Sequence, residues 1–306
     1  MQKSEATVVL LGTEAVPEND ANDPAGDPAP SDAAALVASA EVPPGVRLQT
    51  EDVARIDACD IDWAVWRALA ARVAYHIDRS DVAGVVVGHG PATLAETAYL
   101  LQRVLAPDKP VVLTTARRSP TQSPEGGLQN VSDAIRVATW PGARGVVAVL
   151  GGMLLGALDA SRRRTDAHDD RVCGNAGPLG VLNDGIPTLR RGWPRGEPLG
   201  LGLLPRQPPR VAIVASHGDA DGGVVEALRA QGVDGIVVVD GAGGRLPRRL
   251  EAALREAERQ GGVRILRCVC GVRDAMPAPG DTFECIALSP GQARIELLLR
   301  LRAAEA

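Results

Sequence analysis

Side chains that can do chemistry follow three short apolar runs of the sequence. The residues at the ends of these runs are Thr13, His89 and Thr115. A threonine hydroxyl acts as a nucleophile when a base or a lowered pKa activates it, and histidine can serve as a base or proton shuttle. A hydroxyl at the start of a loop is more often a cap or turn residue. The sequence therefore leaves two interpretations of Thr13 open, nucleophile and turn residue.

Further polar residues lie close to these three in the sequence. Asp60, in the stretch Ala58-Cys59-Asp60, is a candidate base if burial shifts its pKa. His89 is the other candidate base, and its structural alternative is an imidazole bonded to nearby backbone. Thr93 and Glu96 have the spacing of a helix capping box, which is our interpretation of that pair.

The elements that must position these residues alternate between strands and helices. Runs that are apolar on both faces predict buried parallel strands at 7–11, 82–87, 110–114, 145–150, 210–215, 235–239 and 263–269. Helical spacing of apolar residues predicts helices at 63–76, 93–105 and 246–259. The alternation predicts an α/β fold with a doubly wound, mainly parallel sheet and right-handed crossovers. Ligands bind beyond the carboxyl ends of strands in such sheets, so the candidate residues are expected along one edge.

Two segments interrupt this alternation. Residues 18–32 are acidic and rich in proline, without apolar periodicity, and they predict a mobile loop. Residues 193–208 carry several prolines and predict a linker. A chain of 306 residues is long enough for two domains. We therefore expect a large N-terminal domain at 1–192 and a smaller C-terminal α/β domain at 209–306.

Composition limits the classes of partner. The net charge of −5 and the 2% of aromatic residues argue against a protein that binds nucleic acid. The apolar runs are too short to cross a bilayer, and residues 1–5 do not look like the start of a signal peptide. The five cysteines are scattered, and Cys268 with Cys270 has no second ligand pair for zinc. We expect a cytoplasmic protein with no metal, no other cofactor, no membrane partner and no nucleic acid.

Several stretches resemble the bacterial-type L-asparaginase/glutaminase family, in the family's order. Gly84–Leu101 is similar to the family's strand, Thr-His-Gly-Thr-Asp-Thr motif and helix. The other similar stretches are Lys109–Pro120, Glu125–Ala138, Gly177–Gly180 with Asp184-Gly185, Gly232–Gly241 and Leu288–Leu299. The resemblance implies a two-domain asparaginase-like fold, a small-molecule pocket, and a homodimer or homotetramer paired through the C-terminal domain. A hetero-oligomer with an active relative is the alternative.

The resemblance also implies an active site in which most of the family's residues are replaced. The nucleophilic threonine matches Thr13, while the second catalytic threonine and the aspartate fall on Pro91 and Ala92. The catalytic lysine falls on Arg162, whose guanidinium cannot act as a base. A serine that holds the substrate carboxylate falls on Ala58. The implied substrate-binding set is Ala58, Cys59, Gly90, Pro91, Ala92, Thr115 and Arg162.

These replacements leave three functions open. Catalytic residues that act as one unit fail as one unit, so ordinary asparaginase activity is expected to be weak or absent. The first function is a divergent amidohydrolase that uses Thr13, with Asp60 or His89 as base, on the amide of a small amino-acid-like substrate. The second is a repurposed pocket with a different ligand or reaction. The third is a catalytically dead protein that serves as an assembly partner.

Overall fold

The computed structural model describes most of the chain, in two compact units. The described residues are 5–14, 33, 37, 40–115, 126–160, 177–240, 245–269 and 283–305. Those up to Leu201 form the first unit and those from Gly202 onward form the second. The border falls inside the segment 193–208, whose limits as a linker stay a prediction. The predicted mobile loop 18–32 and the candidate residue Arg162 lie outside the described residues.

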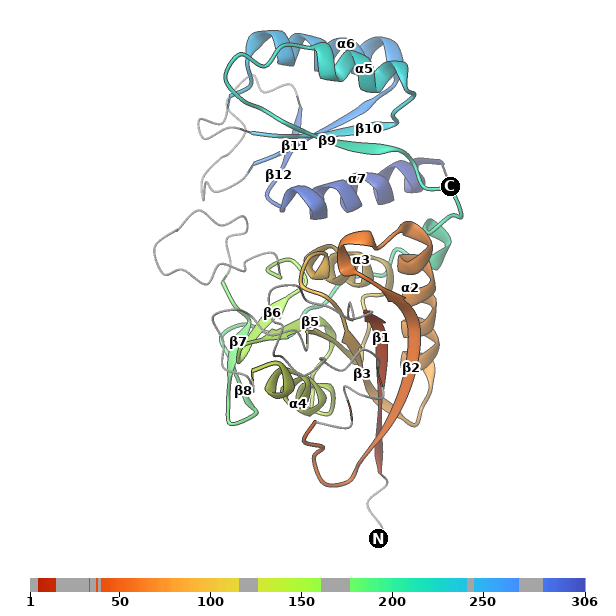
Figure 1. The fold of residues 1–306 in the computed structure, drawn as a ribbon, viewed down its shortest axis with the longest axis vertical. Helices are drawn as coiled ribbons and strands as arrows, with labels where there is room; N and C mark the ends of the chain where they lie inside the picture. Colours follow the sequence, from red (N-terminus) through yellow and green to blue (C-terminus); the bar gives the residue numbers. More distant parts are fainter. Residues whose placement is uncertain are drawn as a thin grey trace, which may run out of the picture. The chain divides into compact units, whose positions relative to one another are not determined.

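An eight-stranded sheet forms the centre of the first unit (Figure 1). Its strands are β1 (Ala6–Glu14), β2 (Val46–Ile56), β3 (Val82–Gly88), β4 (Pro110–Thr114), β5 (Gly145–Leu150), β6 (Met153–Gly156), β7 (Gly180–Asn183) and β8 (Ile186–Leu189). They lie in the order β2-β1-β3-β4-β5-β6-β7-β8. The first five strands are parallel, and β6, β7 and β8 extend the sheet in antiparallel fashion.

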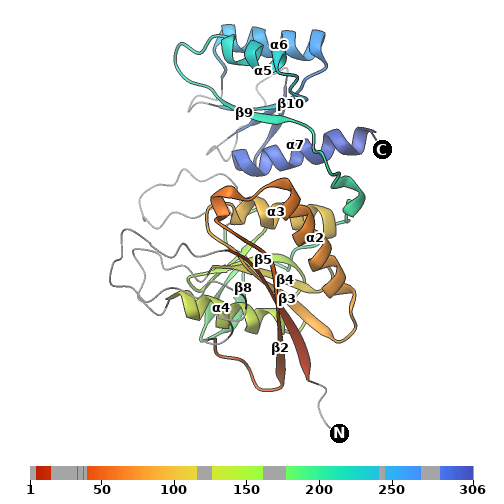
Figure 2. The same cartoon turned by 45° about the vertical axis from the view of Figure 1, so that its right-hand side comes forward.

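Helices cover both faces of this sheet (Figures 1 and 2). They are α2 (Trp63–Asp78), α3 (Leu94–Leu105) and α4 (Gly126–Ala138). Helices α2 and α3 contact each other on one face, and Val131 and Ile135 of α4 pack against Val86 and Val112 on the other. Burial on both faces explains why the central strands are apolar throughout rather than alternating. The predicted doubly wound, mainly parallel α/β fold is confirmed for this unit.

One connection departs from the expected right-handed crossovers. The connections β3–α3–β4 and β4–α4–β5 both join parallel neighbours, and both step in the same direction along the sheet. Because α3 and α4 lie on opposite faces, these two crossovers have opposite hands. The prediction of right-handed crossovers is therefore wrong for one of them. The apolar stripe of α4 covers Val86, Val112 and Val147, which would otherwise face water, and this burial outweighs the usual preference.

The strand order places a topological switch point between β1 and β3. From β1 the chain steps outward to β2, and it then returns past β1 to start β3 and the strands beyond it. Such a reversal leaves a crevice outside the carboxyl ends of the two strands, where α/β proteins bind ligands. Thr13 lies at that end of β1, and His89 directly follows β3. The topology therefore brings these two candidate residues to one crevice.

The second unit is built on a four-stranded parallel sheet in the order β12-β11-β10-β9. Its strands are β9 (Val211–Ala215), β10 (Gly235–Val239), β11 (Arg264–Cys268) and β12 (Glu284–Ile286), and its helices are α5 (Gly223–Ala230), α6 (Arg248–Gly261) and α7 (Pro290–Glu305). Ile236, Leu250 and Leu254 are fully buried between the sheet and α6. Asp240 and Arg267 form a buried ion pair of 2.7 Å at the carboxyl end of β10. The expected smaller α/β domain is confirmed as a fold.

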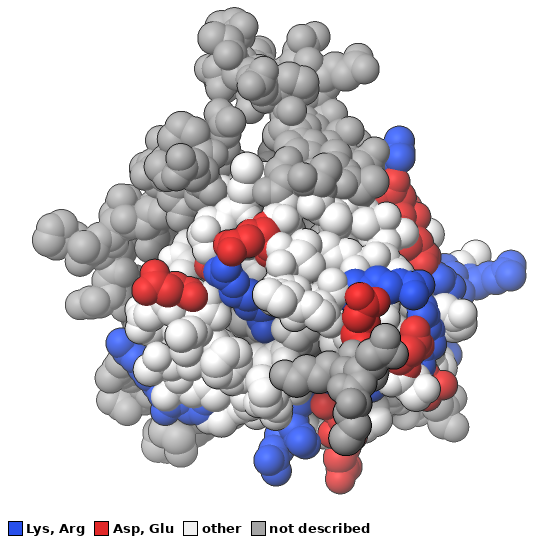
Figure 3. Space-filling view, turned by 90° about the horizontal axis from the view of Figure 1, so that it is seen from below, with Lys and Arg blue, Asp and Glu red and all other residues white. Residues whose placement is uncertain are grey.

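All seven strands and three helices expected from the sequence are present, but β2 and the short strands β6, β7, β8 and β12 were not predicted. Single turns of 3₁₀ helix, η1 (Ala58–Asp60) and η2 (Leu201–Leu203), complete the described elements. Figure 3 shows acidic and basic side chains interspersed over the described part of one face. Within the described residues, no helix has both the length and the apolar character needed to span a membrane.

Candidate functional site at the ends of β1 and β3

Thr13 lies at the carboxyl end of β1, next to the end of β3, with 3% of its surface exposed. Its hydroxyl donates a hydrogen bond of 3.0 Å to the carbonyl of Gly88. The pairing of β1 with β2 shifts register between Gly12 and Glu14, so Thr13 sits on an irregularity of the strand. A side chain at Gly12 would come within 2.7 Å of the Asp52 carboxylate, which explains the glycine before Thr13.

His89 is also buried, and hydrogen bonds occupy both nitrogens of its ring. Nδ1 lies 2.8 Å from the carbonyl oxygen of Gly90, and Nε2 lies 2.8 Å from the hydroxyl of Thr97. The backbone N–H of His89 donates to the carbonyl of Thr114, which ties this turn to the end of β4. This arrangement supports the structural alternative for His89, an imidazole bonded to backbone, while a catalytic role stays a prediction.

Burial lowers the pKa of His89 to about 4, although the carbonyl of Gly90 acts in the opposite direction. The ring is therefore neutral at physiological pH. A carbonyl oxygen only accepts hydrogen bonds, so the proton of the neutral ring is on Nδ1 and Nε2 accepts from Thr97. The lone pair that a general base needs is thus already bonded to a hydroxyl.

The stretch Ala58-Cys59-Asp60 forms the single 3₁₀ turn η1 that follows β2. Ala58 is buried, and its carbonyl accepts a hydrogen bond of 2.8 Å from the hydroxyl of Thr93. Cys59 and Asp60 are exposed. Within the residues that the structure describes, the Asp60 carboxylate forms no hydrogen bond with Thr13 or His89. The structure therefore brings Ala58 close to Thr93, and it leaves Asp60 exposed.

The predicted capping box at Thr93 and Glu96 is wrong. Thr93 is the residue before helix α3, but its side chain makes no capping hydrogen bond to that helix. Its hydroxyl donates to the carbonyl of Ala58 instead. The sequence spacing suits a capping box, in which the threonine oxygen would accept from a backbone N–H of the helix, but the Thr93 side chain is turned to the carbonyl of Ala58, 35 residues earlier in the chain.

Thr115 is buried at the end of β4, where Asn130 of α4 holds it in place. The side-chain amide of Asn130 donates to the carbonyl of Thr115 at 3.2 Å, and its oxygen accepts from the N–H of Gly151 at 2.8 Å. The hydroxyl of Thr114 donates to the carbonyl of Val149 at 2.9 Å. These bonds fix the carboxyl ends of β4 and β5 relative to each other beside the crevice.

Pro91 and Ala92, which follow His89 and Gly90 in the chain, are both exposed, while Gly90 is buried. Neither exposed residue carries a hydroxyl or a carboxylate, so this part of the rim offers no side-chain acid, base or nucleophile. The Thr13 hydroxyl directs its proton to a carbonyl oxygen that is far too weakly basic to accept it. Hydrolysis through Thr13 therefore needs a proton acceptor that replaces Gly88.

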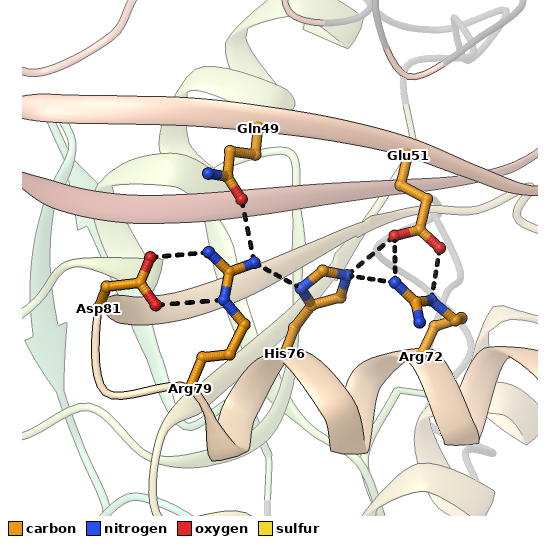
Figure 4. A network of polar contacts seen from close by, with 6 residues as sticks. All are labelled: Gln49, Glu51, Arg72, His76, Arg79 and Asp81. Carbon is orange, nitrogen blue, oxygen red and sulfur yellow. Dashed lines mark hydrogen bonds and ion pairs between the residues drawn. The ribbon is translucent and has the colours of Figure 1, made fainter.

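A polar network outside the crevice holds α2 against the edge strand β2 (Figure 4). Its members are Gln49, Glu51, Arg72, His76, Arg79 and Asp81. Arg72 donates two hydrogen bonds to Glu51, at 2.5 and 2.7 Å, and these lower the pKa of that carboxyl. Nδ1 of His76 lies 3.2 Å from the guanidinium of Arg79, and Nε2 lies 3.2 Å from that of Arg72 and 2.9 Å from the carboxylate of Glu51. The network anchors the helix that also carries Trp66.

Three residues that support the site were not predicted from the sequence. Trp66 donates its indole N–H to the hydroxyl of Thr97, and Thr97 in turn bonds to His89. Asn130 bonds to the ends of β4 and β5. Each is a polar group on an otherwise apolar helix face, and this is the one sequence signal that points to them, because buried polar groups need partners.

The two-unit α/β fold, with a buried threonine at the switch point of its larger sheet, is the fold of known asparaginases. A solved structure, the probable cytoplasmic L-asparaginase from Campylobacter jejuni, superimposes with a TM-score of 0.79 at 24% identity. The match covers 97% of this chain and 95% of that one. At this identity the likeness concerns the fold.

Sequence comparisons give the family. The family model "Asparaginase, N-terminal" matches residues 8–193. L-asparaginase 2 of Escherichia coli K12 is 30% identical over 263 residues, covering 82% of this chain and 75% of that protein. Glutaminase-asparaginase of Pseudomonas fluorescens biotype A is 29% identical over 253 residues, covering 76% and 67%. The chain belongs to the asparaginase family.

Proposed function

We propose that this chain is a divergent amidohydrolase that uses Thr13 on the amide of a small amino-acid-like molecule and hydrolyses asparagine weakly or not at all. Membership of the asparaginase family supports the reaction class. The position of Thr13 at the switch point supports the assignment of the nucleophile, since ligands of α/β sheets bind there. Asp60 and Arg162 are proposed to complete the pocket.

One observation carries the second half of the proposal. The Thr13 hydroxyl donates to the carbonyl of Gly88, and the neighbouring ring of His89 has both nitrogens bonded. The residues that follow, Pro91 and Ala92, supply no hydroxyl and no carboxylate. A nucleophile without a base loses several orders of magnitude in rate, because the members of such a unit act together.

The proposed reaction has simple requirements. The Thr13 oxygen attacks the amide carbon, an ester forms, and the C–N bond breaks with release of ammonia, which takes up the hydroxyl proton. Water then hydrolyses the ester and frees the carboxylic acid and Thr13. The hydroxyl has to turn away from Gly88 in the first step, so the substrate complex must offer it another acceptor. Asp60, exposed at the rim, is our candidate for that acceptor.

A second candidate function is a pocket that binds a different small molecule without hydrolysing it. The same hydrogen bond favours it, because Thr13 in this state is a buried, satisfied side chain rather than an activated nucleophile. A catalytically silent subunit would fit this alternative. For both candidates we propose a homodimer or homotetramer in the cytoplasm.

The test is ammonia release by the purified chain from L-asparagine, L-glutamine and a panel of other small amino-acid amides. Thr13→Ala removes the nucleophile, and Thr13→Ser is the matched control that retains the hydroxyl. We expect asparagine turnover close to that of Thr13→Ala, and release from another amide that disappears in Thr13→Ala and persists in Thr13→Ser. Fast, Thr13-dependent asparagine turnover would refute the claim of weak activity. No Thr13-dependent release from any amide would favour the second candidate.

A further inference from the structure

Thr97 lies at the centre of a buried chain of hydrogen bonds between helix α2 and the crevice. It has no exposed surface, although it carries a polar hydroxyl on the apolar face of α3. The hydroxyl is 2.8 Å from the indole nitrogen of Trp66 on one side and 2.8 Å from Nε2 of His89 on the other. No role in the reaction is assigned to Thr97 by the site described above.

The chemistry of the donors fixes the direction of this chain. An indole N–H only donates, so the oxygen of Thr97 accepts from Trp66. The hydroxyl proton of Thr97 is then free to donate to Nε2 of His89, whose other nitrogen donates to the carbonyl of Gly90. In this series of three hydrogen bonds the indole N–H, the Thr97 hydroxyl and both ring nitrogens of His89 all have partners, so none of these polar groups is left unsatisfied.

The end of this chain holds the turn that contacts Thr13. Gly88 is the last residue of β3, and His89 and Gly90 lead from it into the turn at 91–93; these three residues are called the Gly88–Gly90 turn below. The carbonyls of its first and last residues have different partners. The carbonyl of Gly90 binds the His89 ring, and the carbonyl of Gly88 accepts the hydroxyl of Thr13. A rotation of the ring would release Gly90, and the turn would lose one of the bonds that set the position of Gly88.

We propose that Thr97 is a positioning residue for the Thr13 site, which orients the His89 ring so that the Gly88–Gly90 turn presents its carbonyl to Thr13. The proposal deepens the proposed function and rests on it only in naming Thr13 as the functional residue. Thr97 touches neither a ligand nor Thr13 itself, so it acts through His89. The conformation of the Gly88–Gly90 turn therefore depends on the hydroxyl of Thr97, which does not contact the turn's backbone directly.

Four variants separate positioning from general stability. Thr97→Val replaces the hydroxyl with a methyl group of similar size and breaks both bonds. Thr97→Ser keeps the hydroxyl and should rescue the turn. Trp66→Phe removes the indole donor but leaves the bond between Thr97 and His89 intact, so it should destabilise α2 without loosening the turn. Thr139→Val, directly after the end of α4, is the matched control for loss of a threonine hydroxyl elsewhere.

Hydrogen exchange measured by mass spectrometry on peptides that cover residues 86–93 gives the first readout. We expect about tenfold faster exchange at Gly90 and its neighbours in Thr97→Val, equal to about 1.4 kcal/mol, and wild-type exchange in the other three variants. Equal acceleration across α2, α3 and the turn would show a general loss of stability and overturn the proposal. So would unchanged exchange in Thr97→Val.

NMR of the imidazole nitrogens gives the second readout. The His89 resonances are assigned as those that disappear in His89→Gln. We expect His89 to carry its proton on Nδ1 in the wild type, and the Nε2 resonance to move in Thr97→Val but not in Thr97→Ser or Trp66→Phe. A wild-type ring protonated on Nε2 would overturn the proposal. Neither measurement requires turnover, so absence of Thr13-dependent ammonia release would end the proposed reaction and leave the positioning role standing.

Discussion

Protonation of His89 should destabilise the first unit as the pH falls. The unfolded chain holds this histidine with an ordinary pKa of 6.5, whereas burial lowers the pKa in the folded chain to about 4. Between these two values the unfolded state binds a proton that the folded state does not bind. Stability therefore rises with pH across this interval and is lost as the pH falls from 6.5 towards 4.

The size of the effect follows from the two pKa values. The difference between 6.5 and about 4 corresponds to about 3 kcal/mol, because each pH unit is worth about 1.4 kcal/mol. About 2 kcal/mol of it should be lost between pH 7 and pH 5. No discount for solvent screening applies, since His89 is only 1% exposed.

The measurement is urea unfolding followed by tryptophan fluorescence at several pH values between 7 and 4. All four tryptophans lie in the first unit, so the signal reports the unit that contains His89. His89→Gln removes the titrating ring, and subtraction of its pH profile cancels the carboxylates and the other histidines. His217→Gln, at an exposed ring in the second unit, should retain the wild-type profile. Parallel profiles for wild type and His89→Gln, within about 1 kcal/mol, would refute the reasoning.

Three more substitutions test the packing that supports the two sheets. Asp240→Asn should destabilise the second unit by about 3 to 5 kcal/mol, because it replaces the carboxylate of a buried ion pair with Arg267 by a neutral amide; hydrogen exchange of that unit measures this, and a loss below about 1 kcal/mol would contradict it. Gly84→Ala places a methyl group 2.4 Å from the carbonyl of Ala138, and a cost of about 1 to 3 kcal/mol in urea unfolding is expected; wild-type stability would show that the backbone yields. Gly185→Ala forces a side chain into a φ of 75°, so the thermal midpoint should fall by several degrees, for a cost of about 1 to 2 kcal/mol, and an unchanged midpoint would exclude strain in this turn.

The order of the elements was largely predictable, because the central strands are long apolar runs that few other structures accommodate. Strand β2 was missed for a physical reason. It lies at the edge of the sheet, and its sequence alternates between apolar residues such as Val46 and Leu48 and polar residues such as Gln49 and Glu51. A search for runs that are apolar on both faces cannot find such a strand. The switch point between β1 and β3 exists because β2 lies on the other side of β1. Without β2 in the predicted set of strands, the position of the switch point could not be predicted from the sequence.

The candidate site was predictable in part. Thr13, His89 and Thr115 do lie at the carboxyl ends of adjacent strands, as strand ends in a parallel sheet require. The contacts among side chains were not predictable, since Trp66 and Thr97 are 31 residues apart and nothing local shows that they touch. For the same reason the hydroxyl of Thr93 was assigned to a helix cap that it does not form.

The supports of the crevice and its exposed rim are chemically independent of each other. The bonds that fix the strand ends come from buried residues, Asn130 on α4 and Thr97 on α3, and they bind backbone carbonyls and the ring of His89. None of these bonds involves the side chains at the exposed positions 91 and 92. The hydrogen bonds that keep Thr13 and the strand ends in place therefore do not depend on the side chains at positions 91 and 92. Preservation of the fold is consequently no evidence for preservation of the reaction, and activity on defined amides has to decide it.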